Sequence, residues 1–161
     1  MILAIDPGPE QSAYVLYCDH AIEDAAKVPN ADLLAKLHDR AGSFEFADVC
    51  VIEMIASYGM PVGREVFETC VWIGRFAEAW GCLPPAELIT RGAVKMHLCG
   101  SMRAKDSNIR TALLDMFGGK NAIGTKRLPG LLYGLSGDMW SALAVAVTYS
   151  DRASKPEMVR S

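Results

Sequence analysis

The chain has 161 residues, of which 51% are apolar, and a net charge of −3. This length and composition predict one domain, residues 1–161, with an ordinary apolar core. No charged-then-apolar leader and no apolar run of about 18 residues is present, which disfavours secretion and membrane insertion. Five widely spaced cysteines without a Cys-x-x-Cys pair predict free thiols and a cytoplasmic protein.

The predicted elements alternate along the chain. They are strands at 2–6, 12–18 and, more weakly, within 19–28; a helix that Asn30 caps and that ends near 41; a strand at 47–53; a loop at 56–63; a helix at 63–80; a short strand at 86–90; helices at 91–98 and 106–117; a loop at 118–136; and a helix from 138 to about 151. Early strands followed by interleaved helices favour an α/β fold, with a mixed sheet flanked by helices.

Two of the predicted strands end on an acidic residue. Asp6 follows the apolar run at 2–5, and Glu53 follows the run at 49–52. Asp138 precedes an almost wholly apolar helix, and such a helix is normally buried against a sheet. Each acid also has an ordinary structural explanation, namely a turn residue before Pro-Gly, a strand-end surface acid and a helix N-cap, respectively. Together, however, the three carboxylates can converge on one point.

Converging carboxylates are what a divalent metal ion needs. Mg²⁺ prefers carboxylate oxygens to His or Cys ligands. Hydrolysis of a phosphodiester by two metal ions needs acidic ligands that hold the ions about 3.5 to 4 Å apart. The histidines at 20, 38 and 97 are scattered and form no competing ligand cluster. The sequence therefore predicts a magnesium site at the three acids.

The charge is distributed unevenly. Residues 1–90 have a net charge of −9, whereas residues 91–135 carry eight Lys/Arg and two Asp, a net charge of +6. A basic surface of this kind attracts a phosphate backbone, although it is also compatible with an ordinary solvated face. Beside the acids we interpret this block as a substrate-binding surface that consists of Arg91, Lys95, Arg103, Lys105, Arg110, Lys120, Lys126 and Arg127. All of these except Arg110 are the expected contacts to a nucleic-acid backbone.

Three motifs resemble those of RuvC-type Holliday-junction resolvases. Ala-Ile-Asp-Pro-Gly at 4–8 is similar to the first motif of that family, Val-Ile-Glu at 51–53 to the second, and the stretch 138–149 to the last. Segments 91–95 and 100–108 also resemble family segments in the expected order. The resemblance implies an RNase H-like fold, a mixed five-stranded sheet flanked by helices, and the short chain fits a phage-type member.

The resemblance also implies a function. It predicts a homodimeric, Mg²⁺-dependent endonuclease, with two ions and Mn²⁺ as a possible substitute, that nicks four-way DNA junctions symmetrically. Asp6, Glu53 and Asp138 would be its metal ligands. Lys105 lies within one residue of a basic position that assists catalysis in the family, through stabilisation of phosphate charge. Tyr58 corresponds to an aromatic residue that stacks on unpaired bases at the crossover.

One position departs from the family pattern. Ser141 stands where the family has its final Asp if the motif is aligned without a gap, one helical turn after Asp138 and on about the same face. A neutral hydroxyl binds Mg²⁺ poorly. Either the metal site that includes Ser141 is completed by water, or catalysis is weakened, or the alignment is shifted.

Two alternatives to the junction nuclease stay open. One is an RNase H-like nuclease that acts on RNA, which shares the first and the late acid. The other is a junction-binding protein whose catalysis is weakened or lost, which the serine at 141 suggests. Mg²⁺-dependent cleavage of branched DNA distinguishes both from the resolvase.

Overall fold

The structure is a computed structural model that describes residues 1–40, 42–57, 59, 61–81 and 84–154. Its strands are β1 (Ile2–Asp6), β2 (Gln11–Cys18), β3 (Ala21–Pro29), β4 (Val49–Met54) and β5 (Glu87–Thr90). Its α-helices are α1 (Asn30–Asp39), α2 (Arg64–Trp80), α3 (Arg91–Cys99), α4 (Asp106–Met116) and α5 (Met139–Ala153), with short 3-10 helices η1 (Gly42–Phe46) and η2 (Gly119–Ala122).

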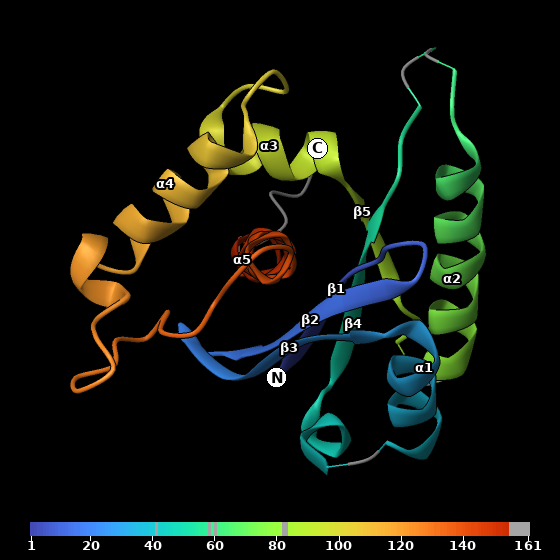
Figure 1. The fold of residues 1–161 in the computed structure, drawn as a ribbon, viewed down its shortest axis with the longest axis horizontal. Coiled ribbons are helices and arrows are strands. Elements are labelled where there is room, and N and C mark those ends of the chain that lie inside the picture. Colours follow the sequence, from blue (N-terminus) through green and yellow to red (C-terminus); the bar gives the residue numbers. More distant parts are fainter. Residues whose placement is uncertain (41, 58, 60, 82–83, 155–161) are drawn as a thin grey trace, which may run out of the picture.

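The five strands form one mixed sheet in the order β3-β2-β1-β4-β5. β2 pairs antiparallel with both β1 and β3. β1 and β4 are parallel, as are β4 and β5, so the carboxyl ends of these three strands meet at one edge. The predicted α/β class and mixed five-stranded sheet are confirmed (Figure 1).

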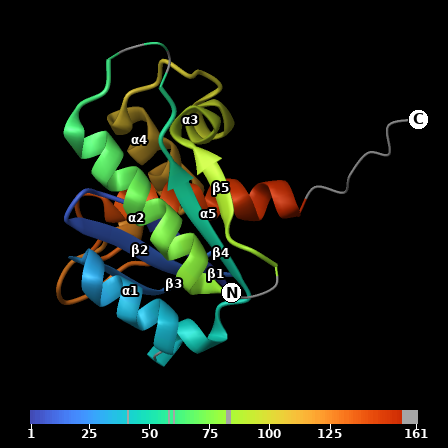
Figure 2. The ribbon, with the colours of Figure 1, turned by 90° about the vertical axis from the view of Figure 1, so that its right-hand side faces the viewer.

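Helices cover both faces of the sheet. α1 and α2 pack on one face, whereas α5 crosses the other face with α3 and α4 beside it (Figures 1 and 2). Because side chains alternate along a strand, Leu3 and Ile5 belong to the core under α1 and α2, and Ala4 belongs to the core under α5. The same alternation decides which residues face the site described below.

α5 is buried along nearly its whole length, as its apolar sequence predicts. Residues 142–148 are all at most 1% exposed. Its single buried polar side chain in this run is Thr148, whose Oγ1 has no hydrogen-bond partner among the described residues. None of the helices in the described part of the chain is long and apolar enough to cross a membrane.

The predicted boundaries agree closely with the observed ones, with three differences. The segment 118–136, predicted to be a loop, contains the short helix η2. The third strand, expected to be weak, is nine residues long. The prediction that Asn30 caps α1 is wrong: Pro29 is the N-cap residue and Asn30 is the first residue of the helix. The Asn30 side chain is instead buried and accepts a hydrogen bond from Ser12 Oγ at 2.6 Å.

Candidate active site

Asp6 and Glu53 lie side by side at the carboxyl ends of β1 and β4. The parallel register pairs Ile5 with Ile52, so the two acids that follow are neighbours on adjacent strands. Both share a strand face with Ala4 and Val51, which belong to the core under α5. The sheet therefore presents both carboxylates to the first turn of α5.

The turn after Asp6 is tied down by a buried hydrogen-bond network. Asn30 Nδ2 donates to the Gly8 carbonyl at 2.9 Å, and the Gly8 amide donates to Ser12 Oγ at 3.3 Å. A Cβ at position 8 would collide with the Gln11 carbonyl oxygen, so only glycine fits this close approach. The network fixes where β1 ends and hence where the Asp6 carboxylate is presented.

Asp138 and Ser141 come to the same place from the start of α5. Asp138 occupies the N-cap position, yet its side chain makes no capping hydrogen bond. It accepts instead from Lys27 Nζ at 2.6 Å. Ser141 lies within hydrogen-bonding reach of Asp6, where it donates to the carboxylate. The N-cap explanation thus does not account for the Asp138 side chain.

Lys27 reaches the site from β3, two strands away from Asp6. The register pairs Asp6 with Ala13 and Ala13 with Lys27, so the three residues form a row across the sheet. Ala13 belongs to the core under α5, and its cross-strand partner Lys27 points to the same face. The hydrogen bond to Asp138 raises the pKa of the Lys27 ammonium, which stays charged.

The Asp6 carboxyl is difficult to ionise in this structure. Its pKa is raised to about 7, mainly by burial and further by the negative charges of Glu53 and Asp138. The Arg91 charge and the hydrogen bond from Ser141 lower it, but they offset only part of the burial effect. A buried carboxyl with neighbouring acids and a pKa near neutrality is typical of a functional site.

Arg91 forms ion pairs with two acids, Glu53 and Asp106. Its Nη1 donates to Glu53 Oε2 at 3.0 Å, and its Nη2 donates to Asp106 Oδ1 at 2.7 Å. The Glu53 side chain is only 12% exposed, which excludes a solvated strand-end acid. Burial raises the Glu53 pKa, and the Arg91 charge and hydrogen bond counteract this rise. Lys95 on α3 acts in the same direction as Arg91.

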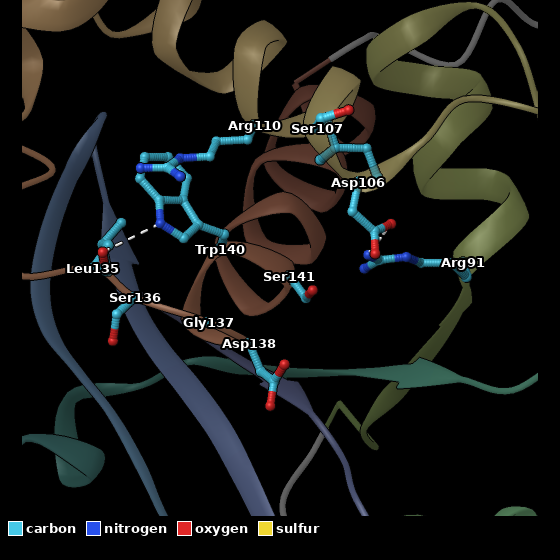
Figure 3. Close-up of a pocket in the computed structure, with 11 residues that line it drawn as sticks. Arg91, Asp106, Ser107, Arg110, Leu135, Ser136, Gly137, Asp138, Trp140 and Ser141 are labelled. Atoms are coloured by element: carbon cyan, nitrogen blue, oxygen red, sulfur yellow. Dashed lines mark hydrogen bonds and ion pairs between the residues drawn. The ribbon is translucent and has the colours of Figure 1, made fainter.

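A cleft of about 560 Å³ opens beside these acids. Figure 3 shows Asp138 and Ser141 near its base, Arg91 with Asp106 on one side, and Arg110 with Trp140 on the other. The cleft lies where α4, the start of α5 and the loop before α5 meet. One wall is thus cationic and aromatic, and the base is acidic.

The other predicted DNA-binding residues lie outside this cleft. Lys105 is the N-cap residue of α4 and is exposed, as is Arg103 in the loop before it. Lys120 belongs to η2, and Lys126 and Arg127 follow in the exposed loop before α5. Tyr58 lies outside the described residues. Among the described residues of the predicted set, only Arg91 lines the cleft.

Three residues of the site were missed by sequence reasoning, namely Lys27, Asp106 and Trp140. Arg110 was part of the predicted basic block but not of the predicted site. Trp140 and Arg110 are part of predicted helices, and nothing in their spacing indicates that they meet. The alternation of β3 places Lys27 on a definite face, but only its register with β2 shows that this face holds the acids.

The donor set fits a hard divalent cation. Asp6, Glu53, Asp138 and Ser141 offer oxygen atoms alone, which suits Mg²⁺. Among the described residues no three Asp, Glu, His or Cys side chains are already arranged around one metal position. Two of the carboxylates are paired with cationic side chains, Asp138 with Lys27 and Glu53 with Arg91. The predicted metal ligands stay a prediction.

Comparison with known proteins identifies the fold. No protein-family model matches the chain, and no curated protein matches it in sequence. The solved structures that resemble it include Thermus thermophilus RuvC, with a TM-score of 0.64 over 94% of both chains at 16% sequence identity. The chain has a RuvC-type fold. A second RuvC structure, from T. thermophilus in complex with a Holliday junction substrate, matches with the same TM-score and identity over 94% of this chain and 93% of that chain. The RuvC-type, RNase H-like architecture expected from the three motifs is thereby confirmed.

Proposed function

We propose that this protein is a Mg²⁺-dependent, structure-selective endonuclease that resolves four-way DNA junctions by paired nicks. The observation that carries the proposal is the meeting of Asp6, Glu53 and Asp138 from β1, β4 and α5 beside an open, partly cationic cleft. The RuvC-type fold, found also in a protein bound to a Holliday junction, supports a branched-DNA substrate.

The three acids would hold the metal, with two Mg²⁺ ions expected and Mn²⁺ as a substitute. Ions bound there would activate a water molecule and stabilise the leaving oxygen. Asp6 must be ionised to bind a cation, and its pKa of about 7 makes that step sensitive to pH near neutrality. The Ser141 hydroxyl orients the Asp6 carboxylate, and Arg91 orients Glu53.

The cationic residues around the acids would bind the DNA backbone. Arg91 and Lys95 lie close enough to Glu53 to lower its pKa, so they are placed to contact the phosphate that faces the acids. Arg103, Lys105, Lys120, Lys126 and Arg127 would contact phosphates further along the arms. Base stacking by Tyr58 stays a prediction.

Paired nicks require two active sites, and we propose a homodimer. The surface of α2 exposes two large apolar residues one helical turn apart, Phe67 at 62% and Val71 at 61%. Phe76 on the opposite side of the helix is buried in the core. α2 covers the face of the sheet opposite to α5, so dimerisation through it leaves the acidic site open.

A second function is a junction-binding protein with weak or no cleavage. The specific observation in its favour is Ser141, a neutral residue at the acidic site, together with the ion pairs that occupy Glu53 and Asp138. Binding without cleavage is the behaviour that separates the two.

The test uses purified protein and four labelled substrates: a four-way junction, a matched duplex, a flap and an RNA–DNA hybrid, each with Mg²⁺, Mn²⁺ or EDTA. Paired nicks near the branch that need a metal ion support the resolvase. Tight junction binding without nicks under either metal establishes the second function. Cleavage of the hybrid alone identifies a nuclease that acts on RNA.

The matched variant is Asp6→Asn. It removes one negative charge that faces the phosphate and one predicted metal ligand, so cleavage should be lost while junction binding stays equal or improves. Loss of binding together with cleavage would contradict the metal-ligand role of Asp6.

A further inference from the structure

Arg110 and Trp140 form one wall of the cleft beside the acids. The Arg110 guanidinium lies 4.8 Å from the centre of the Trp140 ring, in a cation–π contact. The ring itself is held by a hydrogen bond from Nε1 to the Leu135 carbonyl at 3.2 Å and is 8% exposed. The guanidinium therefore rests on a fixed platform, as Figure 3 shows.

Arg110 is the cation of the cleft that has no acid to neutralise it. Arg91 is paired with Glu53 and Asp106, and Lys27, close to the cleft, is paired with Asp138. In the part of the chain that the structure describes, no carboxylate lies within ion-pair distance of Arg110. Its charge and its planar set of N–H donors remain available to an anion from outside the molecule.

The cleft connects this free cation with the candidate catalytic acids. Its volume of about 560 Å³ is lined by Arg110 at one side and by Asp138 and Ser141 at its base. A polyanionic strand that brings one phosphate to the acids must continue past them, and the walls of the cleft limit where it can go. Ser107 and Ser136 add hydroxyl groups along the same walls.

We propose that the cleft is a subsite for the DNA strand next to the scissile phosphate, in which Arg110 binds a neighbouring phosphodiester group. Its guanidinium donates two hydrogen bonds to the phosphate oxygens, and Trp140 keeps it extended, so little side-chain entropy is lost on binding. Arg110 is a positioning residue: it sets the register of the strand and does not touch the reacting phosphate. This inference rests on the proposed function, because it takes DNA to be the substrate.

The test measures DNA binding in EDTA, where no cleavage occurs. Arg110→Ala and Arg110→Gln each remove the cation from an exposed helix position, and both residues are compatible with a helix. The control is Lys36→Ala on α1, because the Lys36 ammonium also lies over an aromatic ring, 5.1 Å from the centre of the Tyr14 ring, but α1 lies on the face of the sheet opposite to α5 and outside the proposed dimer surface (Figure 1). Circular dichroism verifies that all variants are folded.

Binding of a fluorescent four-way junction is titrated from about 50 to about 200 mM salt. Loss of one phosphate contact should reduce the slope of log K against log salt by about 0.9. The affinity of both Arg110 variants should fall about tenfold, the lower range for a hydrogen-bonded charged pair. The Lys36 variant should keep the wild-type slope and affinity.

The outcomes separate this inference from the proposed function. Wild-type binding with unchanged slopes in both Arg110 variants overturns the subsite and leaves the nuclease proposal standing. An equal loss in Lys36→Ala also overturns it, since the effect is then one of net charge. Absence of any DNA binding by the wild-type protein overturns both.

Discussion

Replacing Asp6 by Asn should stabilise the protein at alkaline pH, although it should abolish cleavage. Asp6 has a pKa of about 7 in the folded state against 3.8 as its ordinary value, with burial as the main cause. Between these two pH values the folded protein binds the proton more tightly than the unfolded chain does. The free energy of unfolding therefore falls as the pH rises from about 4 to about 7.

The size of the effect follows from the two pKa values. A rise from 3.8 to about 7 corresponds to up to about 4 kcal/mol of lost stability once Asp6 is ionised. An Asn at this position has no charge to desolvate and can still accept the hydrogen bond from Ser141. Asp6→Asn should thus gain up to about 4 kcal/mol at pH 8, a rise of roughly 2 M in the urea midpoint, and almost nothing near pH 4.

The assay is urea unfolding in EDTA at several pH values between about 4 and 8, with wild-type protein alongside. Asp48→Asn is the control with the opposite sign, because the N-terminal ammonium lowers the pKa of that exposed carboxyl and its charged form is the favoured one. A wild-type protein that is more stable than Asp6→Asn at pH 8 would refute the reasoning. So would a difference that does not shrink as the pH falls.

Three further predictions concern Lys27, Thr148 and Gly8. Lys27→Met should raise the affinity for Mn²⁺ about three- to tenfold in DNA-free protein, because the ammonium then no longer competes for the Asp138 carboxylate; calorimetric titration measures this, and weaker binding would show that Lys27 helps to build the site. Thr148→Val should raise the free energy of unfolding by about 1 kcal/mol, since it removes a buried hydroxyl without a described partner. A thermal melt that shows destabilisation would mean that the hydroxyl is paired. Gly8→Ala should lower the free energy of unfolding by about 1 to 3 kcal/mol, because its Cβ collides with a backbone carbonyl; wild-type stability in urea would show that the turn can relax.

Local sequence patterns predict most of the fold because they report which side chains must be buried. The strands that carry Asp6 and Glu53 near their carboxyl ends, and the apolar helix that follows Asp138, all lie close to their predicted places. Those three elements are also the ones that bring the acids together. The acids could be predicted as a group because each one directly follows or precedes a strong apolar pattern.

The cations of the site could not be predicted in the same way, because their positions depend on contacts between distant elements. Lys27 contacts Asp138 only because β3 pairs with β2 in the observed register. That register shifts by one residue near Leu16 and Tyr17, which local sequence patterns do not indicate. Arg91 reaches Asp106 because α3 and α4 pack against each other after a loop of unpredictable direction. The role of Asn30 was wrongly predicted for a related reason, because the hydrogen-bond partners of its side chain lie in and just after the turn that follows β1.

The three acids are also far apart in the sequence, with consequences for when the site forms during synthesis. Asp6 and Glu53 are present as soon as β1 and β4 have paired, but Asp138 arrives only with α5, which is synthesised after both. A nascent or truncated chain without α5 has an exposed sheet face and an incomplete site. The order of synthesis therefore keeps the group of acids incomplete until α5 has formed, and a chain split in the loop before α5 would bring the three acids together only when its two parts associate.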